Sequence, residues 1–149
     1  MVGGVDSAMA GDQLKKLVFP SLGWAEELCR RANKDKYLRE IGKGFSETIT
    51  IIINDRDNKR RALKFIIEDG KCMGVYYNER LDEIPRDSDL ILEADIDTWL
   101  KIIRFETTPT KALFTRKLRI VKGSRLMIFS RPLAHYQILY LASKISEGI

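Results

Sequence analysis

The sequence predicts an α+β fold, with five short strands and several helices packed as one unit. Three observations support this prediction. Segments rich in β-branched residues occupy the middle of the chain, segments with helical periodicity lie on both sides of them, and the first three strands are joined by connections too short for a parallel return. A length of 149 residues, 44% of them hydrophobic, suits one domain with one sizeable core.

The chain is expected to begin with a short lead that precedes the folded domain. Residues 1–20 predict a flexible or partly helical lead, and residues 21–149 predict the folded domain. No cluster of positive charge precedes an apolar stretch at the start, so a secretory signal is not expected. Ser21 then provides an N-cap for a helix. The apolar stripe of that helix recurs at every fourth position: Trp24, Leu28 and Ala32.

Three strands follow in a predicted meander. Residues 48–53 alternate so that three isoleucines share one face, and residues 62–67 and 72–77 form the next two strands. Asp69-Gly70 can adopt the positive backbone dihedrals of a tight hairpin turn. Connections this short predict antiparallel pairing of the three strands.

The rest of the domain alternates strands and helices. A fourth strand is expected at residues 90–94, after which Asp97 can cap a helix. Pro109 begins another short helix. A fifth strand at residues 118–122 precedes a final helix that Pro132 opens.

The final helix, residues 132–145, is too apolar for an ordinary surface helix. A helix beside a sheet needs one apolar face, so something besides the sheet must cover the surplus. Taken alone, the helix is compatible with plain core packing, a subunit contact or the lid of an apolar ligand site. Its apolar side chains are Leu133, Ala134, Tyr136, Ile138, Leu139, Tyr140, Leu141, Ala142 and Ile145.

Cysteine content and hydropathy predict an intracellular protein. Cys29 and Cys72 lie far apart with no Cys-x-x-Cys pairing, so neither a disulfide framework nor a zinc cluster is indicated. Cys72 is interpreted as a small buried side chain within a strand. No apolar run approaches the roughly eighteen residues of a membrane span. We therefore expect a soluble protein in a reducing cytoplasm.

Charge patterning leaves several partners open. Against a net charge of +5, basic groups at residues 59–61 and 116–125 could bind the phosphates of nucleic acid, a CoA moiety or an anionic membrane surface. Nucleic acid is not expected, because no helix-turn-helix, glycine-loop or zinc pattern accompanies the charge. The carboxylates between residues 82 and 97 have no spacing that makes them converge, so a metal site is not expected.

The sequence does not predict an enzyme. The single histidine, His135, has no Ser or Cys nucleophile in a recognisable motif around it, and a lone histidine near a helix start is usually structural or exposed. We therefore expect no catalytic residue and no cofactor.

Several motifs between residues 24 and 145 resemble the type-two sterol carrier protein family of lipid-binding domains, and their order matches that family. Arg116 stands where the family commonly has a glycine, and Val121 adds one residue before Gly123, a spacing similar to a prokaryotic branch. The motifs are Trp-Ala-Glu-Glu-Leu at 24–28, Leu-Glu-Ala-Asp at 92–95 followed by Thr98-Trp99, Thr108-Pro109, Lys-Leu-Arg-Ile at 117–120 and Lys-Gly-Ser at 122–124.

The resemblance implies a twisted, mainly antiparallel sheet of about five strands that helices cover on one face, with an apolar tunnel between the layers. It also implies noncatalytic binding of fatty acids, acyl-CoA, phospholipids or sterol-like lipids. The alternatives are a homodimeric interaction domain that uses the final helix, or an accessory domain that serves a lipid-metabolising enzyme. The residues expected along the tunnel are Phe65, Trp99, Leu100, Ile103, Leu113, Phe114, Leu126, Met127, Phe129, Leu133, Tyr136, Leu139 and Tyr140.

Overall fold

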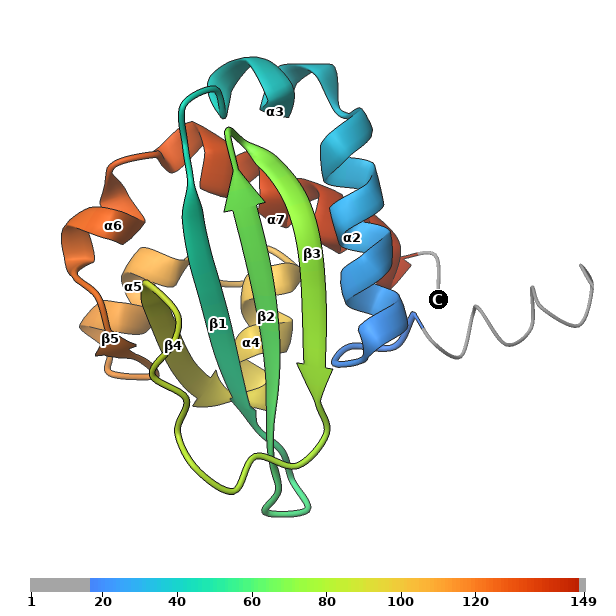
Figure 1. Cartoon of the computed structure of the whole chain (residues 1–149). Helices are drawn as coiled ribbons and strands as arrows, with labels where there is room; N and C mark the ends of the chain where they lie inside the picture. The colour runs from blue at the N-terminus through green and yellow to red at the C-terminus, as the bar shows by residue number, and fades with distance from the viewer. Residues whose placement is uncertain (1–16, 148–149) are drawn as a thin grey trace, which may run out of the picture.

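The computed structural model describes residues 17–147, so most of the predicted N-terminal lead lies outside the described residues. The described elements follow the predicted order, with two additional short helices, one after the first helix and one before the last (Figure 1). They are α2 (Leu22–Lys34), α3 (Lys36–Ile41), β1 (Glu47–Asn54), β2 (Arg60–Glu68), β3 (Lys71–Asn78), β4 (Leu90–Asp95), α4 (Ile96–Ile103), α5 (Pro109–Phe114), β5 (Leu118–Lys122), α6 (Arg125–Phe129) and α7 (Pro132–Glu147).

The five strands form one sheet in the order β3-β2-β1-β4-β5. Three of the four pairings are antiparallel, which confirms the predicted meander, and β1 pairs with β4 in parallel. The hairpin between β2 and β3 turns through Asp69 and Gly70, with φ values of 51° and 74°. A Cβ at position 70 would lie 2.4 Å from the Gly42 carbonyl oxygen, so glycine is also required there for space.

Of the two predicted helix caps, the one at Ser21 is present and the one at Asp97 is wrong. The Ser21 side chain accepts a hydrogen bond from the Trp24 amide at 3.1 Å, and α5 begins with a similar cap from Thr108. Asp97, predicted as a cap, lies instead in the first turn of α4, because that helix already begins at Ile96. Its carboxylate pairs with the guanidinium of Arg56.

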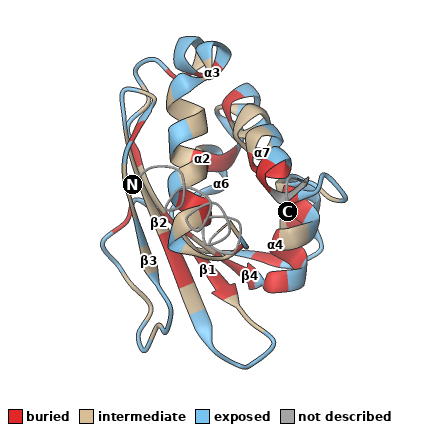
Figure 2. Ribbon diagram, turned by 90° about the vertical axis from the view of Figure 1, so that its right-hand side faces the viewer, coloured by how far each residue is buried: buried red, intermediate tan, exposed pale blue. Residues whose placement is uncertain are grey.

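The helices lie on one face of the sheet and leave the other face open (Figures 1 and 2). Trp99 of α4 fastens the two layers, because its indole Nε1 donates a hydrogen bond to the Ile52 carbonyl of β1 at 3.0 Å. On the open face, the segment between β3 and β4 packs against the strands. Ser88 bonds Thr50 at 2.5 Å and Asp87 pairs with Lys64 at 2.7 Å, which holds β4 beside β1.

Helix α2 is fixed to β3 by a side-chain amide and a disulfide. Asn33 donates to the Cys72 carbonyl at 2.9 Å and accepts from the Cys72 amide at 2.8 Å. Cys72 is buried, as predicted, but it is bonded to Cys29, so the inference that the cysteines form no disulfide is wrong. The two cysteines meet because α2 packs along β3, a contact between segments that lie 43 residues apart.

Helix α7 is surrounded by other helices on much of its circumference. It contacts α2, α3, α4 and α6, and its Ala134, Ala142 and Ile145 are buried. These contacts between helices cover part of the apolar surface of α7 for which the sequence alone indicated no partner. Within residues 17–147, no helix is both long enough and apolar enough to cross a membrane.

Candidate functional site

The helix-facing side of the sheet is largely apolar. The strand register places Ile51 of β1 opposite Leu63 of β2 on one side and opposite Leu92 of β4 on the other. Because paired residues point to the same face of a sheet, these side chains and their alternate neighbours all face the helices. The sheet therefore presents apolar side chains toward the helices, of which α2 contacts β3 and α4 contacts β1 and β4.

This surface is not completely filled by the helices. Ile51 is only half-buried although it lies on the central strand beneath the helices, whereas its neighbour Ile52, on the other face, is fully buried. Interior side chains at such a position are ordinarily buried against close-packed neighbours. Besides Leu17, the half-buried apolar residues that pack against the buried core are Ile51, Phe65, Val75, Tyr77, Leu92, Leu100, Leu113, Ile138, Leu139 and Leu141, here called the apolar layer.

Seven of the predicted tunnel residues are buried or half-buried, and they differ in degree. Phe65, Leu100, Leu113 and Leu139 belong to the apolar layer. Met127 is half-buried too. Trp99 and Ile103 are fully buried and belong to the core that joins the layers.

The other six predicted tunnel residues are exposed on the outside of the helices. Helix α7 packs against α2, α3, α4 and α6, and part of its surface still faces outward. These six residues are Phe114, Leu126, Phe129, Leu133, Tyr136 and Tyr140. We call the five on α6 and α7 (Leu126, Phe129, Leu133, Tyr136 and Tyr140) the outer stripe. Exposed Phe105 lies beside it, with its ring 5.4 Å from that of Tyr136.

Sequence reasoning missed more than half of the apolar layer. The missed residues are mostly on strands, and their alternation with residues of the open face was a signal that could have identified them. The burial of each side chain, however, depends on how closely the helices approach. The missed residues are Ile51, Val75, Tyr77, Leu92, Ile138 and Leu141.

The two predicted basic groups differ in how their charge is balanced. Arg60 and Arg61 of the first group pair with acidic side chains: Arg60 with Glu93, and Arg61 with Asp55 and Asp57. In the second group, Arg119 pairs with Glu93. Arg116, Lys117 and Arg125 have no ion pair within the part of the chain that the structure describes.

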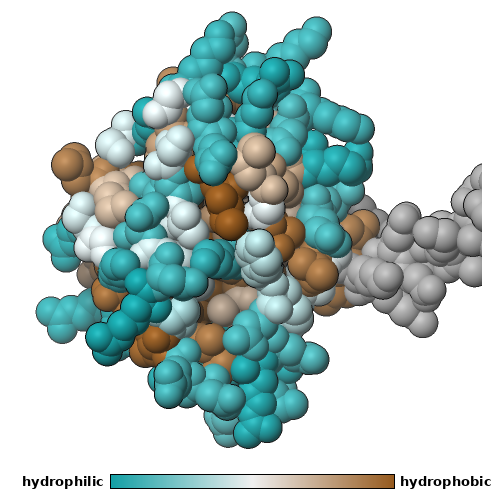
Figure 3. Space-filling view, viewed as in Figure 1, coloured by the Kyte–Doolittle hydropathy of each residue, from teal (hydrophilic) through white to brown (hydrophobic). Residues whose placement is uncertain are grey.

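On the open face of the sheet, hydrophilic side chains surround smaller hydrophobic patches (Figure 3).

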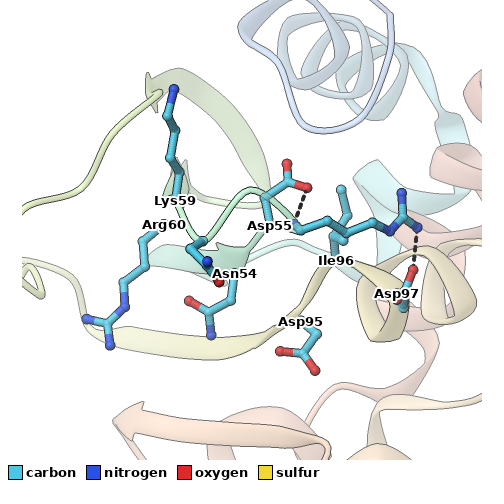
Figure 4. A pocket seen from close by; sticks show the side chains of 9 residues that line it. Asn54, Asp55, Lys59, Arg60, Asp95, Ile96 and Asp97 are labelled. Carbon is cyan, nitrogen blue, oxygen red and sulfur yellow. Dashed lines mark hydrogen bonds and ion pairs between the residues drawn. The ribbon is translucent and has the colours of Figure 1, made fainter.

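A polar cleft of about 400 Å³ lies where β1 and β4 end (Figure 4). Its walls carry Asp55, Asp95 and Asp97 as well as Lys59 and Arg60, so charges of both signs alternate around it. Such a lining suits water and ions better than an acyl chain. The cleft is therefore distinct from the apolar layer. Among residues 17–147, no group of three His, Cys, Asp or Glu side chains could hold a metal ion.

His135 lies near the start of α7 and is partly buried. Burial lowers the pKa of its imidazole, a hydrogen bond to the backbone of Ile128 opposes that change, and nearby Arg131 lowers the pKa further. The fold therefore favours the neutral form of the imidazole.

Comparison with known families and structures gives a consistent match. The family described as the SCP-2 sterol transfer family matches residues 25–126. None of the curated protein sequences matches the chain.

Several solved structures have a similar fold. A conserved hypothetical protein from Thermus thermophilus has a TM-score of 0.71 at 22% identity, over 82% of this chain and 85% of that one. A crystal structure of sterol carrier protein 2 has a TM-score of 0.70 at 20% identity, over 83% and 95%. Sterol carrier protein 2 from Aedes aegypti, in complex with palmitate, has a TM-score of 0.51 at 12% identity, over 76% and 88%. At these identities the likeness establishes the fold.

Proposed function

Because this chain belongs to the SCP-2 sterol transfer family, we propose that it binds lipids in its apolar layer and carries them without chemical conversion. The observation that carries the proposal is the contrast within β1, where Ile51 is half-buried beneath the helices and Ile52 is fully buried. Apolar side chains that solvent still reaches, enclosed between two layers, suit an acyl chain or a sterol ring system.

The ligand class is proposed from the lining of the layer and from a related structure. Apart from the Tyr77 hydroxyl, the side chains of the layer have no polar group, so they bind by shape and apolar contact. The half-buried Met127 of α6 has a flexible thioether side chain, which can adapt to ligands of different outline. The palmitate in the Aedes aegypti sterol carrier protein 2 supports a fatty acyl ligand. Acyl-CoA, phospholipids and sterol-like molecules are further candidates of the same chemistry.

We propose no catalytic step. A general base needs a reactive group within hydrogen-bond reach. The contacts of His135 that shift its pKa are the Ile128 backbone and the charge of Arg131, and neither is a nucleophile. A cytoplasmic location remains a prediction, since the Cys29–Cys72 disulfide is more typical of oxidising compartments.

An anionic membrane surface is the proposed place of lipid exchange. Between residues 98 and 146 the sequence has ten Lys and Arg and one acidic residue, Glu106. The same part of the chain contains the outer stripe and Phe105. Exposed aromatic and leucine side chains among unbalanced basic charges are typical of surfaces that insert into the lipid headgroup region.

A homodimer is the second candidate, favoured by the three-and-four spacing of the outer stripe, which is also typical of helix pairing. Two copies that met through this surface would each bring the basic excess, and the like charges would repel. Sedimentation velocity over a range of concentrations distinguishes the two, because a stable dimer keeps its mass on dilution. An accessory role beside a lipid-metabolising enzyme is compatible with either arrangement.

Binding of a fluorescent fatty acid to the delipidated full chain tests the proposal. Leu92→Trp adds bulk on the helix-facing side of β4, so we expect it to weaken binding at least tenfold, because a ring fills space that the ligand needs. Ile66→Trp is the matched control, since Ile66 is also half-buried but lies on the open face of β2. Equal binding by the two variants would contradict a site between the layers.

A further inference from the structure

Glu47 has a buried carboxyl group that has no role in the proposed carrier function as described so far. It is the first residue of β1, and its side chain is only 9% exposed. Its Oε1 atom is buried and has no hydrogen-bond partner. Groups of this kind are rare in folded proteins, since an unsatisfied buried oxygen lowers stability.

Glu47 lies on the side of the sheet that carries the apolar layer. It pairs with Ile67 of β2, and along β1 it alternates with Ile49 and Ile51, which face the helices. One pleat, about 7 Å of strand, separates Glu47 from Ile49. The carboxyl group is therefore placed at one end of the apolar layer.

The second buried glutamate shows how the fold satisfies such a group elsewhere. Glu93 of β4 lies on the open face, where it accepts a hydrogen bond from the Asn54 amide at 3.2 Å and pairs with Arg60 and Arg119. Glu47 has no such set of partners. The sheet can therefore provide partners for a buried glutamate, and the unpaired oxygen of Glu47 is specific to its position.

The nearest arginine is engaged with other groups. Arg131 donates to the Ile41 carbonyl at 3.4 Å, and its guanidinium lies 4.9 Å from the centre of the Phe45 ring. No ion pair joins it to Glu47 in the described residues. Burial raises the pKa of Glu47, the nearby carboxylate of Asp89 raises it further, and the charge of Arg131 opposes both.

We propose that Glu47 binds the hydroxyl group of a lipid whose apolar body lies in the apolar layer. This inference rests on the proposed carrier function and adds to it a preference, among lipids of similar chain length, for those that carry an alcohol group. A hydroxyl donates a hydrogen bond to a carboxyl oxygen whether that carboxyl is ionised or neutral. A ligand carboxylate would instead meet two acidic side chains, Glu47 and Asp89.

The test compares two ligands that differ in one hydrogen-bond donor. Hexadecanol and hexadecyl methyl ether compete with a fluorescent fatty acid for the delipidated full chain. We expect the wild-type protein to bind the alcohol about tenfold more tightly, a factor that one hydrogen bond to a buried acceptor can supply. In Glu47→Leu the preference is expected to vanish while affinity for the ether stays within about twofold. Glu93→Gln is the control and should keep the preference.

Stability provides a second measurement that shows whether the variant is folded. Glu47→Leu is expected to unfold at the same temperature as the wild-type protein or higher, because it removes a buried group that lacks a partner. A wild-type protein without preference for the alcohol, or a folded Glu47→Leu that keeps it, overturns the inference while leaving the carrier function intact. Failure of the fluorescent probe to bind the wild-type protein contradicts the carrier function itself, and this inference with it.

Discussion

The outer stripe is predicted to insert into the headgroup region of a membrane, and the chain offers a matched control surface for testing this. Leu133 and Tyr136 are 59% and 62% exposed, and each would bury much of that surface in a lipid headgroup region. Full burial of such a side chain is worth about 1.5–3 kcal/mol, so three-fifths of it is about 1 kcal/mol or more for each residue. The double variant Leu133→Ser/Tyr136→Ser should therefore lose about 2 kcal/mol of membrane affinity, about thirtyfold in Kd.

A matched control lies on the edge strand β3. Met73 and Tyr76 are 59% and 60% exposed, so Met73→Ser/Tyr76→Ser removes a similar apolar surface from the other side of the molecule. The assay is co-sedimentation with vesicles of phosphatidylcholine, with and without phosphatidylserine. Binding should need the anionic lipid and weaken as salt is added. Equal losses in the two double variants, or wild-type binding by Leu133→Ser/Tyr136→Ser, would refute the assignment of this surface.

Three further predictions concern stability. Replacing both Cys29 and Cys72 by Ser should lower the free energy of unfolding, measured in denaturant, by up to about 4 kcal/mol. The reason is that the disulfide closes a loop with a sequence separation of 43. An unchanged midpoint of denaturant unfolding would contradict a stabilising bond. Trp99→Phe should cost about 1–3 kcal/mol, because the Ile52 carbonyl loses its indole donor, and the same denaturant titration measures it. Burial lowers the pKa of His135 below the ordinary 6.5, so the folded state binds this proton less readily than the unfolded state, and stability should fall as the pH drops through and below that value. His135→Gln should flatten this dependence in thermal unfolding followed from neutral to acidic pH, and an unchanged slope would show that other groups cause it.

The strands and their order were predictable because their signals are local. The alternating isoleucines of β1 and the Asp69-Gly70 turn each depend on neighbouring residues only, and the structure contains both. The parallel pairing of β1 with β4 was not stated in advance. It depends on the segment from residue 79 to residue 89, whose Ser88 and Asp87 bond to strands distant in sequence.

The candidate site was predicted less well, because burial is a tertiary property. Helical periodicity identified the final helix as unusually apolar, but it could not tell Leu139, which joins the apolar layer, from Tyr140, which faces outward. The disulfide was missed for a related reason. Cys29 and Cys72 become neighbours only when α2 packs along β3, with Asn33 bridging to the same strand.

Native mass spectrometry of the freshly purified full chain tests the lipid-carrier function most directly. We expect a population heavier than the bare polypeptide by the mass of one lipid, which is lost on delipidation and restored as a one-to-one complex by added palmitate or hexadecanol. A folded protein that carries no lipid when purified, and takes up none at concentrations that saturate a carrier, would contradict it.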